Sequence, residues 1–263
     1  YKLACCYDNG EYVERDYAQA VKLYSEAAND GYPAAQNAYG WCFVVGKTVK
    51  TDLYEAARWF QRAAKQGDKR AQYNLAVCYE KGNGVKQNVE KAFNYFKLSA
   101  EQGDDRAQLN LGWYYMRGNG VKPDGKLSFE WLQKSANQGN MQALCDMGYC
   151  YSNGIGVKKD KAEGFKYYLK SAENANTMAM YNVACGYRHG DGVKKDLVKS
   201  AEWYKKAAES GDTDSMLCLG YFYERGKGVK KDLKKAAEYY RAALENGEQG
   251  AVYLLRRKKF LSL

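Results

Sequence analysis

The feature that most constrains the fold is a tandem repeat of fixed length. The pattern Gly-x-Gly-Val begins at Gly82, Gly118, Gly154, Gly190 and Gly226, each 36 residues after the last. The same register reaches back to Gly46 and Gly10 without an insertion, which gives seven repeats. A unit this short cannot bury an apolar face alone, so successive repeats must stack on one another.

Each repeat predicts two helices joined by the glycine turn. Six residues after each of the seven glycines stands a short acceptor that suits the N-cap of a helix. These residues are Asp16, Asp52, Asn88, Asp124, Asp160, Asp196 and Asp232. Glu55 and Glu163 follow two of them at the spacing of a capping box. We call the helix before the turn the A helix and the helix after it the B helix.

The B helix carries paired aromatic positions followed by small residues, as in Trp59-Phe60 before Ala64. Small residues allow neighbouring helices to approach closely. Glycine then stands where a left-handed C′ residue ends the helix, and Ala175 is the one departure. Those glycines are Gly31, Gly67, Gly103, Gly139, Gly211 and Gly247.

The predicted fold class is all-α: a right-handed superhelical α/α solenoid of about seven 36-residue helix-turn-helix repeats with a C-terminal capping helix. We expect a single domain over 1–263. Its predicted repeats are 1–34, 35–70, 71–106, 107–142, 143–178, 179–214 and 215–250, followed by a partial repeat at 251–263. The basic run Arg256-Arg257-Lys258-Lys259 is interpreted as a solvated helix end.

The segment AQYNLAVCYEKGNGVKQNVEKAFNYFKLSAEQGD resembles the Sel-one-like repeat, a relative of the tetratricopeptide repeat, and the resemblance covers essentially the whole chain. Tyr12 and Thr48 depart from it by replacing the second turn glycine. The resemblance implies a non-catalytic scaffold or adaptor that binds proteins. One alternative is a regulatory or substrate-recruiting module of a larger enzyme, for example a kinase-linked one. A hydrolase of bacterial wall material is a third hypothesis.

The eight cysteines do not form a disulfide framework, because all of them fall in predicted A helices. Stacked helices lie roughly 10 Å apart, beyond the reach of a bridge between equivalent positions. No CxxC-type spacing predicts a zinc site, and we expect no cofactor. Cysteines of this kind favour a reducing compartment, and we predict a cytoplasmic protein, although the chain begins without methionine.

Two patterns imitate catalytic or nucleotide-binding motifs. His189 is the only histidine and lies four residues after Cys185, the spacing of a nucleophile and its base on one helix face. No orienting carboxylate accompanies them. Gly120 to Leu127 imitates a phosphate-binding loop, but Leu127 replaces the metal-binding hydroxyl and no strand precedes it. The sequence therefore predicts no catalytic residue.

The formal charge of +10 suits an acidic partner. Lysines recur in the turns, but no aromatic residues alternate with them to stack on bases, which disfavours nucleic acid. No apolar run is long enough to span a membrane. We therefore expect a protein or an extended, acidic peptide as partner. The sequence predicts neither its identity nor an oligomeric state.

A helical wheel of the A helix places positions 3, 4, 7, 10 and 11 opposite the predicted core. We expect this side to line the concave surface and to bind the partner, with amides holding its backbone and aromatics as anchors. The alternative is that the aromatics pack between repeats. The predicted face consists of Trp41, Tyr73, Asn74, Lys81, Asn110, Trp113, Arg117, Asp146, Tyr149, Tyr181, Asn182, Arg188, His189, Tyr221 and Arg225.

Overall fold

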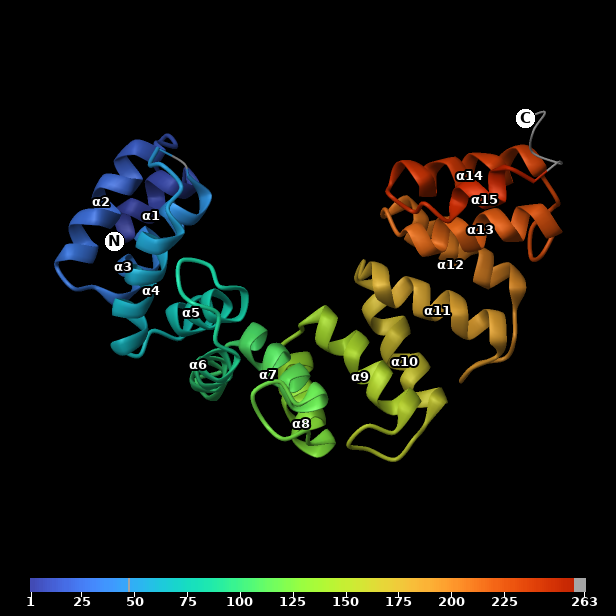
Figure 1. Cartoon of the computed structure of the whole chain (residues 1–263), viewed down its shortest axis with the longest axis horizontal. Helices are drawn as coiled ribbons and strands as arrows, with labels where there is room; N and C mark the ends of the chain where they lie inside the picture. The colour runs from blue at the N-terminus through green and yellow to red at the C-terminus, as the bar shows by residue number, and fades with distance from the viewer. Residues whose placement is uncertain (47, 258–263) are drawn as a thin grey trace. The chain divides into compact units, whose positions relative to one another are not determined.

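The computed structural model describes residues 1–46 and 48–257, and every regular element in that part is a helix (Figure 1). The A helices are α1 (Lys2–Asn9), α3 (Pro33–Val45), α5 (Lys69–Lys81), α7 (Asp105–Arg117), α9 (Met141–Asn153), α11 (Thr177–His189) and α13 (Thr213–Arg225). The B helices are α2 (Tyr17–Asn29), α4 (Leu53–Lys65), α6 (Val89–Glu101), α8 (Gly125–Asn137), α10 (Lys161–Glu173), α12 (Leu197–Glu209) and α14 (Leu233–Glu245). The short α15 (Ala251–Leu255) follows.

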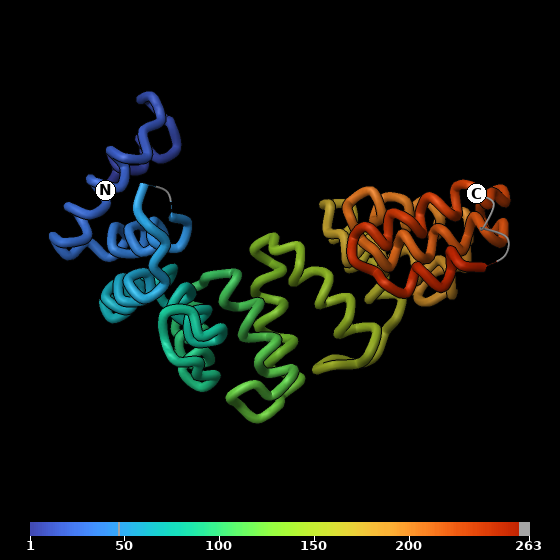
Figure 2. Tube along the Cα trace, turned by 45° about the horizontal axis from the view of Figure 1, so that its top comes forward, coloured from blue at the N-terminus to red at the C-terminus, as the bar shows by residue number. Residues whose placement is uncertain are grey.

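The helices form two compact units, residues 1–138 with α1 to α8 and residues 139–263 with α9 to α15. Within each unit every A helix packs on the B helix of its own repeat, and that B helix packs on the next A helix. Figure 2 shows these hairpins following one another along the trace of each unit. The predicted all-α hairpin repeats are confirmed, and so is a short helix after the seventh repeat. Residues 258–263 of the predicted partial repeat, with Lys258 and Lys259 of the basic run, lie outside the described residues.

The predicted N-caps are confirmed in all seven B helices, where the side chain accepts from a first-turn amide. The backbone amide of each cap donates to the carbonyl of the aromatic residue three positions before the turn glycine, as Asp196 does to Tyr187 (2.9 Å). Because that amide is already bonded, Glu55 and Glu163 form no capping box. They pair instead with Arg58 and Lys166.

The second turn glycine permits the close approach of successive repeats. Gly192 has φ +75, and a Cβ there would collide with the carbonyl oxygen of Lys161 on the preceding B helix. Gly228 makes the same approach to Leu197. The three residues that replace a glycine of the repeat keep the left-handed conformation, with φ 65 at Tyr12, 61 at Thr48 and 64 at Ala175.

In the core of each hairpin, a large side chain of the B helix, either aromatic or leucine, packs on a small residue of the A helix. Phe60 and Tyr240 are 2% and 1% exposed. A Cβ on Gly40 or Gly220 would clash with these rings. The predicted small residues therefore bring the helix backbones together.

In the first unit, one glutamine in each of α3, α5 and α7 bonds the preceding repeat and is held by a second glutamine of its own repeat. Gln72 is 5% exposed, donates to the Ala64 carbonyl of the preceding B helix (3.4 Å) and accepts from Gln102 (2.8 Å). Gln36 with Gln66 and Gln108 with Gln138 repeat this arrangement. In the second unit the position of Gln72 is taken by Leu144, Met180 and Met216, all buried.

All eight cysteines are free thiols, as predicted. Burial raises the pKa of Cys78 to about 11 and that of Cys150 to about 12. Both thiols are therefore protonated at neutral pH and serve as small core residues.

Candidate functional site

The aromatic residues of the predicted face are not buried between helices. Trp41 on α3 and Tyr149 on α9 are each 43% exposed. Trp113 on α7 and Tyr221 on α13 are half-buried. The Arg117 guanidinium lies 4.6 Å from the centroid of the Trp113 ring, so this indole is covered by a cation.

The predicted ladder of open amides is wrong at Asn74, which is 5% exposed. Its Nδ2 donates to Oδ1 of Asn37 on the preceding A helix (2.7 Å). Asn110 is half-buried, and its Nδ2 donates to the Arg106 carbonyl (3.1 Å). The Asn74 amide joins two A helices, whereas the Asn110 amide bonds its own helix, and both are already bonded within the chain.

The same correction applies in the second unit. Asp146 is 3% exposed and accepts from Gln142 (3.0 Å), although we expected it on the surface. Asn182 donates to the Cys145 sulfur (3.7 Å) on the preceding A helix. Position 4 of the A helix therefore faces the neighbouring A helix, which the wheel of an isolated helix does not include.

The remaining members of the predicted face differ in their exposure to solvent. The side chains near the C-terminal ends of the A helices are exposed, namely Lys81, Arg117, His189 and Arg225. Tyr73, Tyr181 and Arg188 are half-buried. The charged ends thus remain accessible where the central amides do not.

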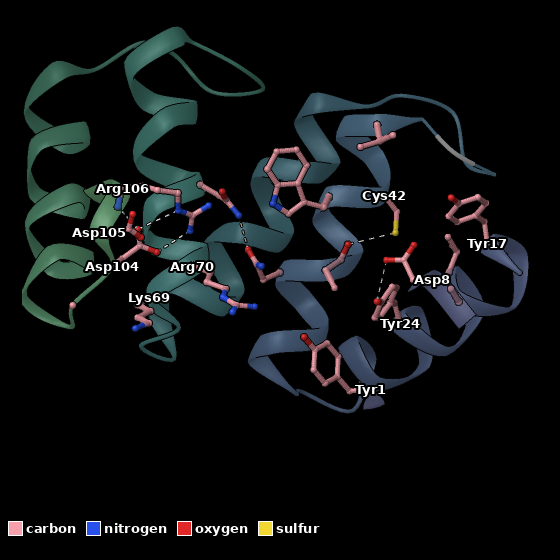
Figure 3. Close-up of a pocket in the computed structure, with 18 of the residues that line it drawn as sticks. Tyr1, Asp8, Tyr17, Tyr24, Cys42, Lys69, Arg70, Asp104, Asp105 and Arg106 are labelled. Carbon is pink, nitrogen blue, oxygen red and sulfur yellow. Dashed lines mark hydrogen bonds and ion pairs between the residues drawn. The ribbon is translucent and has the colours of Figure 1, made fainter. Parts of the chain in front are cut away.

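The first unit contains a pocket of about 780 Å³, formed by α1, α2, α3, α5 and the start of α7 (Figure 3). Two members of the predicted face, Trp41 and Asn74, line it. The half-exposed Trp41 indole supplies an apolar surface, and Val21 and Val45 extend it. A partner side chain could bury apolar area against this wall.

One wall of this pocket carries three cations, Lys69, Arg70 and Arg106, together with the carboxylates of Asp104 and Asp105. Arg106 is bonded to Asp104, with Nη2 2.7 Å from Oδ2, and its guanidinium covers the Tyr73 ring at 4.2 Å. Lys69 donates to the Gln102 carbonyl (3.4 Å). Arg70 extends into the open pocket in Figure 3, and it forms no ion pair with any residue the structure describes. Arg70 is thus available to an anionic group.

The opposite wall carries Asp8 and Tyr24. The Tyr24 hydroxyl donates to the Asp8 carboxylate (3.3 Å), and burial raises the pKa of Tyr24. Burial also raises the pKa of Cys42, which lines the pocket beside them, to about 11. The pocket therefore separates a carboxylate from a guanidinium across an aromatic surface.

Sequence reasoning missed Arg70, Lys69, Asp8 and Tyr24. Lys69 and Arg70 precede the alanine from which the helical wheel was counted, and Asp8 and Tyr24 belong to the first repeat, which the predicted face omitted. The column that contains Arg70 holds arginine again at Arg106 and was a usable signal.

The arrangement gives no support for catalysis. Cys185 and His189 line different cavities, and the Cys185 sulfur contacts the Tyr204 hydroxyl at 3.3 Å. Asp124 accepts from the amides of Lys126 and Leu127, so a carboxylate stands where the imitation of a phosphate loop would hold phosphate. The described residues contain no cluster of three metal-ligating side chains. None of their helices is long and apolar enough to cross a membrane.

Comparison with known protein families recovers the seven repeats. The Sel1 repeat family model matches residues 1–32, 33–68, 69–104, 105–140, 142–176, 177–212 and 213–248. Five of these matches begin two residues before the predicted boundaries, the fifth repeat begins one residue before, and the first begins at the same residue. Comparison with curated proteins gives no match.

Solved structures share this fold. A protective antigen of uropathogenic Escherichia coli with the SLR fold is 35% identical with a TM-score of 0.82, over 97% of this chain and 54% of its own. The chain therefore spans about half the length of that protein. A Sel1 repeat protein of Oxalobacter formigenes is 29% identical with a TM-score of 0.85, over 92% and 97%. An immunity protein of Pseudomonas aeruginosa is 19% identical over 82% of this chain and 83% of its own, with a TM-score of 0.53, and shares the fold alone.

Seven matches in one register account for nearly the whole chain, and the same residues form the hairpins of the structure. Proteins of this family are generally protein-interaction scaffolds. The chain belongs to the Sel1 repeat family.

Proposed function

We propose that this chain is a non-catalytic scaffold that binds an extended, acidic segment of a partner protein along its A helices. The observation that carries the proposal is the pocket of the first unit, where Arg70 and the exposed Trp41 lie within one cavity. A carboxylate of the partner pairs with Arg70, and an adjacent apolar side chain packs on Trp41. The net charge of +10 draws acidic partners toward the chain.

A photo-crosslinking experiment tests this proposal. A benzophenone amino acid replaces Val45, which lines the pocket and is 53% exposed, and captured proteins are mapped by mass spectrometry. We expect crosslinks to acidic segments. Both Trp41→Ala and Arg70→Glu should reduce capture by about tenfold or more.

The matched control is Arg241→Glu, which makes the same charge change on the exposed side of α14. Circular dichroism confirms that each variant is folded. Equal loss of capture in Arg70→Glu and Arg241→Glu, or crosslinks without an acidic bias, would contradict the proposal.

A second proposal keeps the same binding chemistry within a larger enzyme, in which the repeats recruit a substrate. The observation in its favour is length, because the E. coli relative is almost twice as long as the matched region. The coding sequence around this segment tests it directly. A catalytic domain in the same reading frame would support it, and a complete gene without one would end it.

A further inference from the structure

Two cavities of the second unit occupy the same place in successive repeats. The first measures about 310 Å³, and its walls include Ser152, Asn153, Lys159, Lys161, Gly186 and Asp191. The second measures about 230 Å³ and is lined by Arg188, His189, Lys195, Leu197, Phe222 and Lys227. Each of these six residues follows its counterpart by 36 positions. The two cavities therefore form a natural comparison on one backbone.

The first cavity is lined by two lysines, and one of them is paired with a carboxylate of the same cavity. The Nζ of Lys161 lies 2.6 Å from Oδ1 of Asp191, and this hydrogen bond lowers the pKa of Asp191. Ser152 and Asn153 are neutral. The carboxylate of Asp191 in the sixth repeat thus compensates the charge of Lys161 in the fifth repeat.

The second cavity has no such compensation. Lys227 stands where the first cavity has Asp191, and Arg188 and His189 replace the neutral Ser152 and Asn153. No acidic residue lines this cavity. Among the described residues, none forms an ion pair with Arg188, Lys195 or Lys227.

The nearby carboxylates are bonded elsewhere. Asp196 caps α12 by accepting from the amides of Val198 and Lys199. Glu224 is buried and paired with Arg257 (3.0 Å). The buried Phe222 adds an apolar surface to the cavity.

We propose that this second cavity, the Lys227 cavity, binds the phosphate group of a phosphorylated serine or threonine in a partner protein. The phosphate carries close to two negative charges and three acceptor oxygens, which match three cationic side chains better than the single charge of a carboxylate. The Arg188 fork and the two ammonium groups supply several N–H donors. Arg188 uses Nη1 for the Cys218 sulfur (3.7 Å) and Lys227 donates to the Tyr221 hydroxyl (3.2 Å), so the remaining N–H groups of each are those offered to the phosphate. This inference rests on the proposed function for its protein ligand and adds a second, chemically distinct contact.

The test is a titration of the ¹⁵N-labelled chain with N-acetyl-O-phosphoserine amide, followed by NMR. We expect shifts of the amide signals of Arg188, His189, Lys195 and Lys227. Lys227→Asp restores the charge found in the first cavity and should weaken binding by about tenfold or more. The exposed Lys158→Asp makes the same charge change outside both cavities and should leave binding within about twofold.

A second variant tests whether phosphoserine binding can be introduced into the first cavity. Asp191→Lys removes the internal carboxylate of the first cavity and should create a new set of shifts around Lys159 and Lys161. This outcome supports the proposal even if Lys227→Asp fails to fold, whereas a folded Asp191→Lys chain without new shifts counts against it.

Several results would overturn the assignment. They are absence of binding, equal weakening by Lys227→Asp and Lys158→Asp, or equal affinity for N-acetyl-aspartate amide. Inorganic phosphate that binds as tightly as the phosphoserine probe would reassign the cavity to the free ion. Binding only to vesicles of phosphorylated lipid would reassign it to a membrane. The scaffold proposal fails separately, through Val45 crosslinks that do not depend on Arg70.

Discussion

At the position of Gln72, neighbouring repeats of the first unit are joined by hydrogen bonds, and those of the second unit by apolar side chains. Gln72 satisfies a carbonyl at the end of the preceding B helix and is held by Gln102. Met180 and Met216, at the same position in the second unit, bury comparable volume without a hydrogen bond partner. The comparison teaches that this position requires a long side chain that fills the junction, and that either chemistry meets the requirement.

The largest expected loss of stability comes from changing the second turn glycine. The change tests whether both units share one turn geometry. Gly84→Ala in the first unit and Gly228→Ala in the second each place a methyl group against a backbone carbonyl, of Leu53 and Leu197. We expect a loss of about 2–5 kcal/mol in the free energy of unfolding in both cases. Urea unfolding with segment-resolved hydrogen exchange measures it, because solenoid repeats can unfold locally.

The control is Gly211→Ala, a position with φ +90 and no atom near the added methyl group. It should cost only about 1–2 kcal/mol, from the left-handed conformation. If Gly84→Ala costs no more than Gly211→Ala, the close approach between repeats does not limit the turn.

The next effect breaks the polar junction itself. Gln102→Ala removes the donor to the buried Gln72 oxygen and should cost about 1–2 kcal/mol. Ser210→Ala changes the equivalent position of the second unit, where the hydroxyl bonds only its own helix, and should cost about 0.5 kcal/mol or less. Chemical denaturation of both variants gives the difference.

A double variant then converts the junction to the apolar type. Gln72→Met combined with Gln102→Ala should recover about 1 kcal/mol relative to Gln102→Ala alone, because no buried amide is left without a donor. A double variant less stable than the single one would mean that the hydrogen bonds, and not the filled volume, hold the first unit together.

A smaller effect has the opposite sign. Ala175 in the second unit adopts φ 64, where the other repeats have glycine. Ala175→Gly should therefore stabilise the chain by about 0.5–1 kcal/mol, seen as a higher urea midpoint. Gly139→Ala, the reverse change at the previous repeat, should lower it.

The smallest effect concerns the charge pair of the first cavity. The pKa of Asp191 is lowered in the folded chain, so its stabilising contribution is present above the unfolded pKa and is lost as pH falls through the folded pKa. Because the pair is exposed, Asp191→Asn should cost only about 0.5 kcal/mol near neutral pH and nothing in strong acid. Urea midpoints of both chains at neutral pH and at pH ~2 measure this.

The sequence predicted the hairpins well because their determinants are local. Each Asp cap and each turn glycine acts within a few residues, and Ala175 adopts the conformation that its column requires. The glutamine junctions were not predicted. Gln36, Gln72 and Gln108 share one column, but the partner of each lies 30 residues further along the chain.

The site was predicted less well because it depends on contacts between repeats. A wheel describes one helix, and position 4 is buried by the neighbouring A helix, as the Asn37–Asn74 pair shows. Position 7 is less enclosed, and its residues Trp41 and Tyr149 are exposed as predicted. Arg70 lay outside the counted positions.

The uninterrupted register has a consequence for how such a chain changes over generations. Every hairpin meets its neighbours through the same cap, glycine and aromatic positions. Duplication or loss of one 36-residue segment in frame therefore creates a junction that already exists elsewhere in the chain. Recombination can lengthen or shorten the gene by whole hairpins, while point changes at columns such as that of Asp191 and Lys227 give each copy its own surface charge.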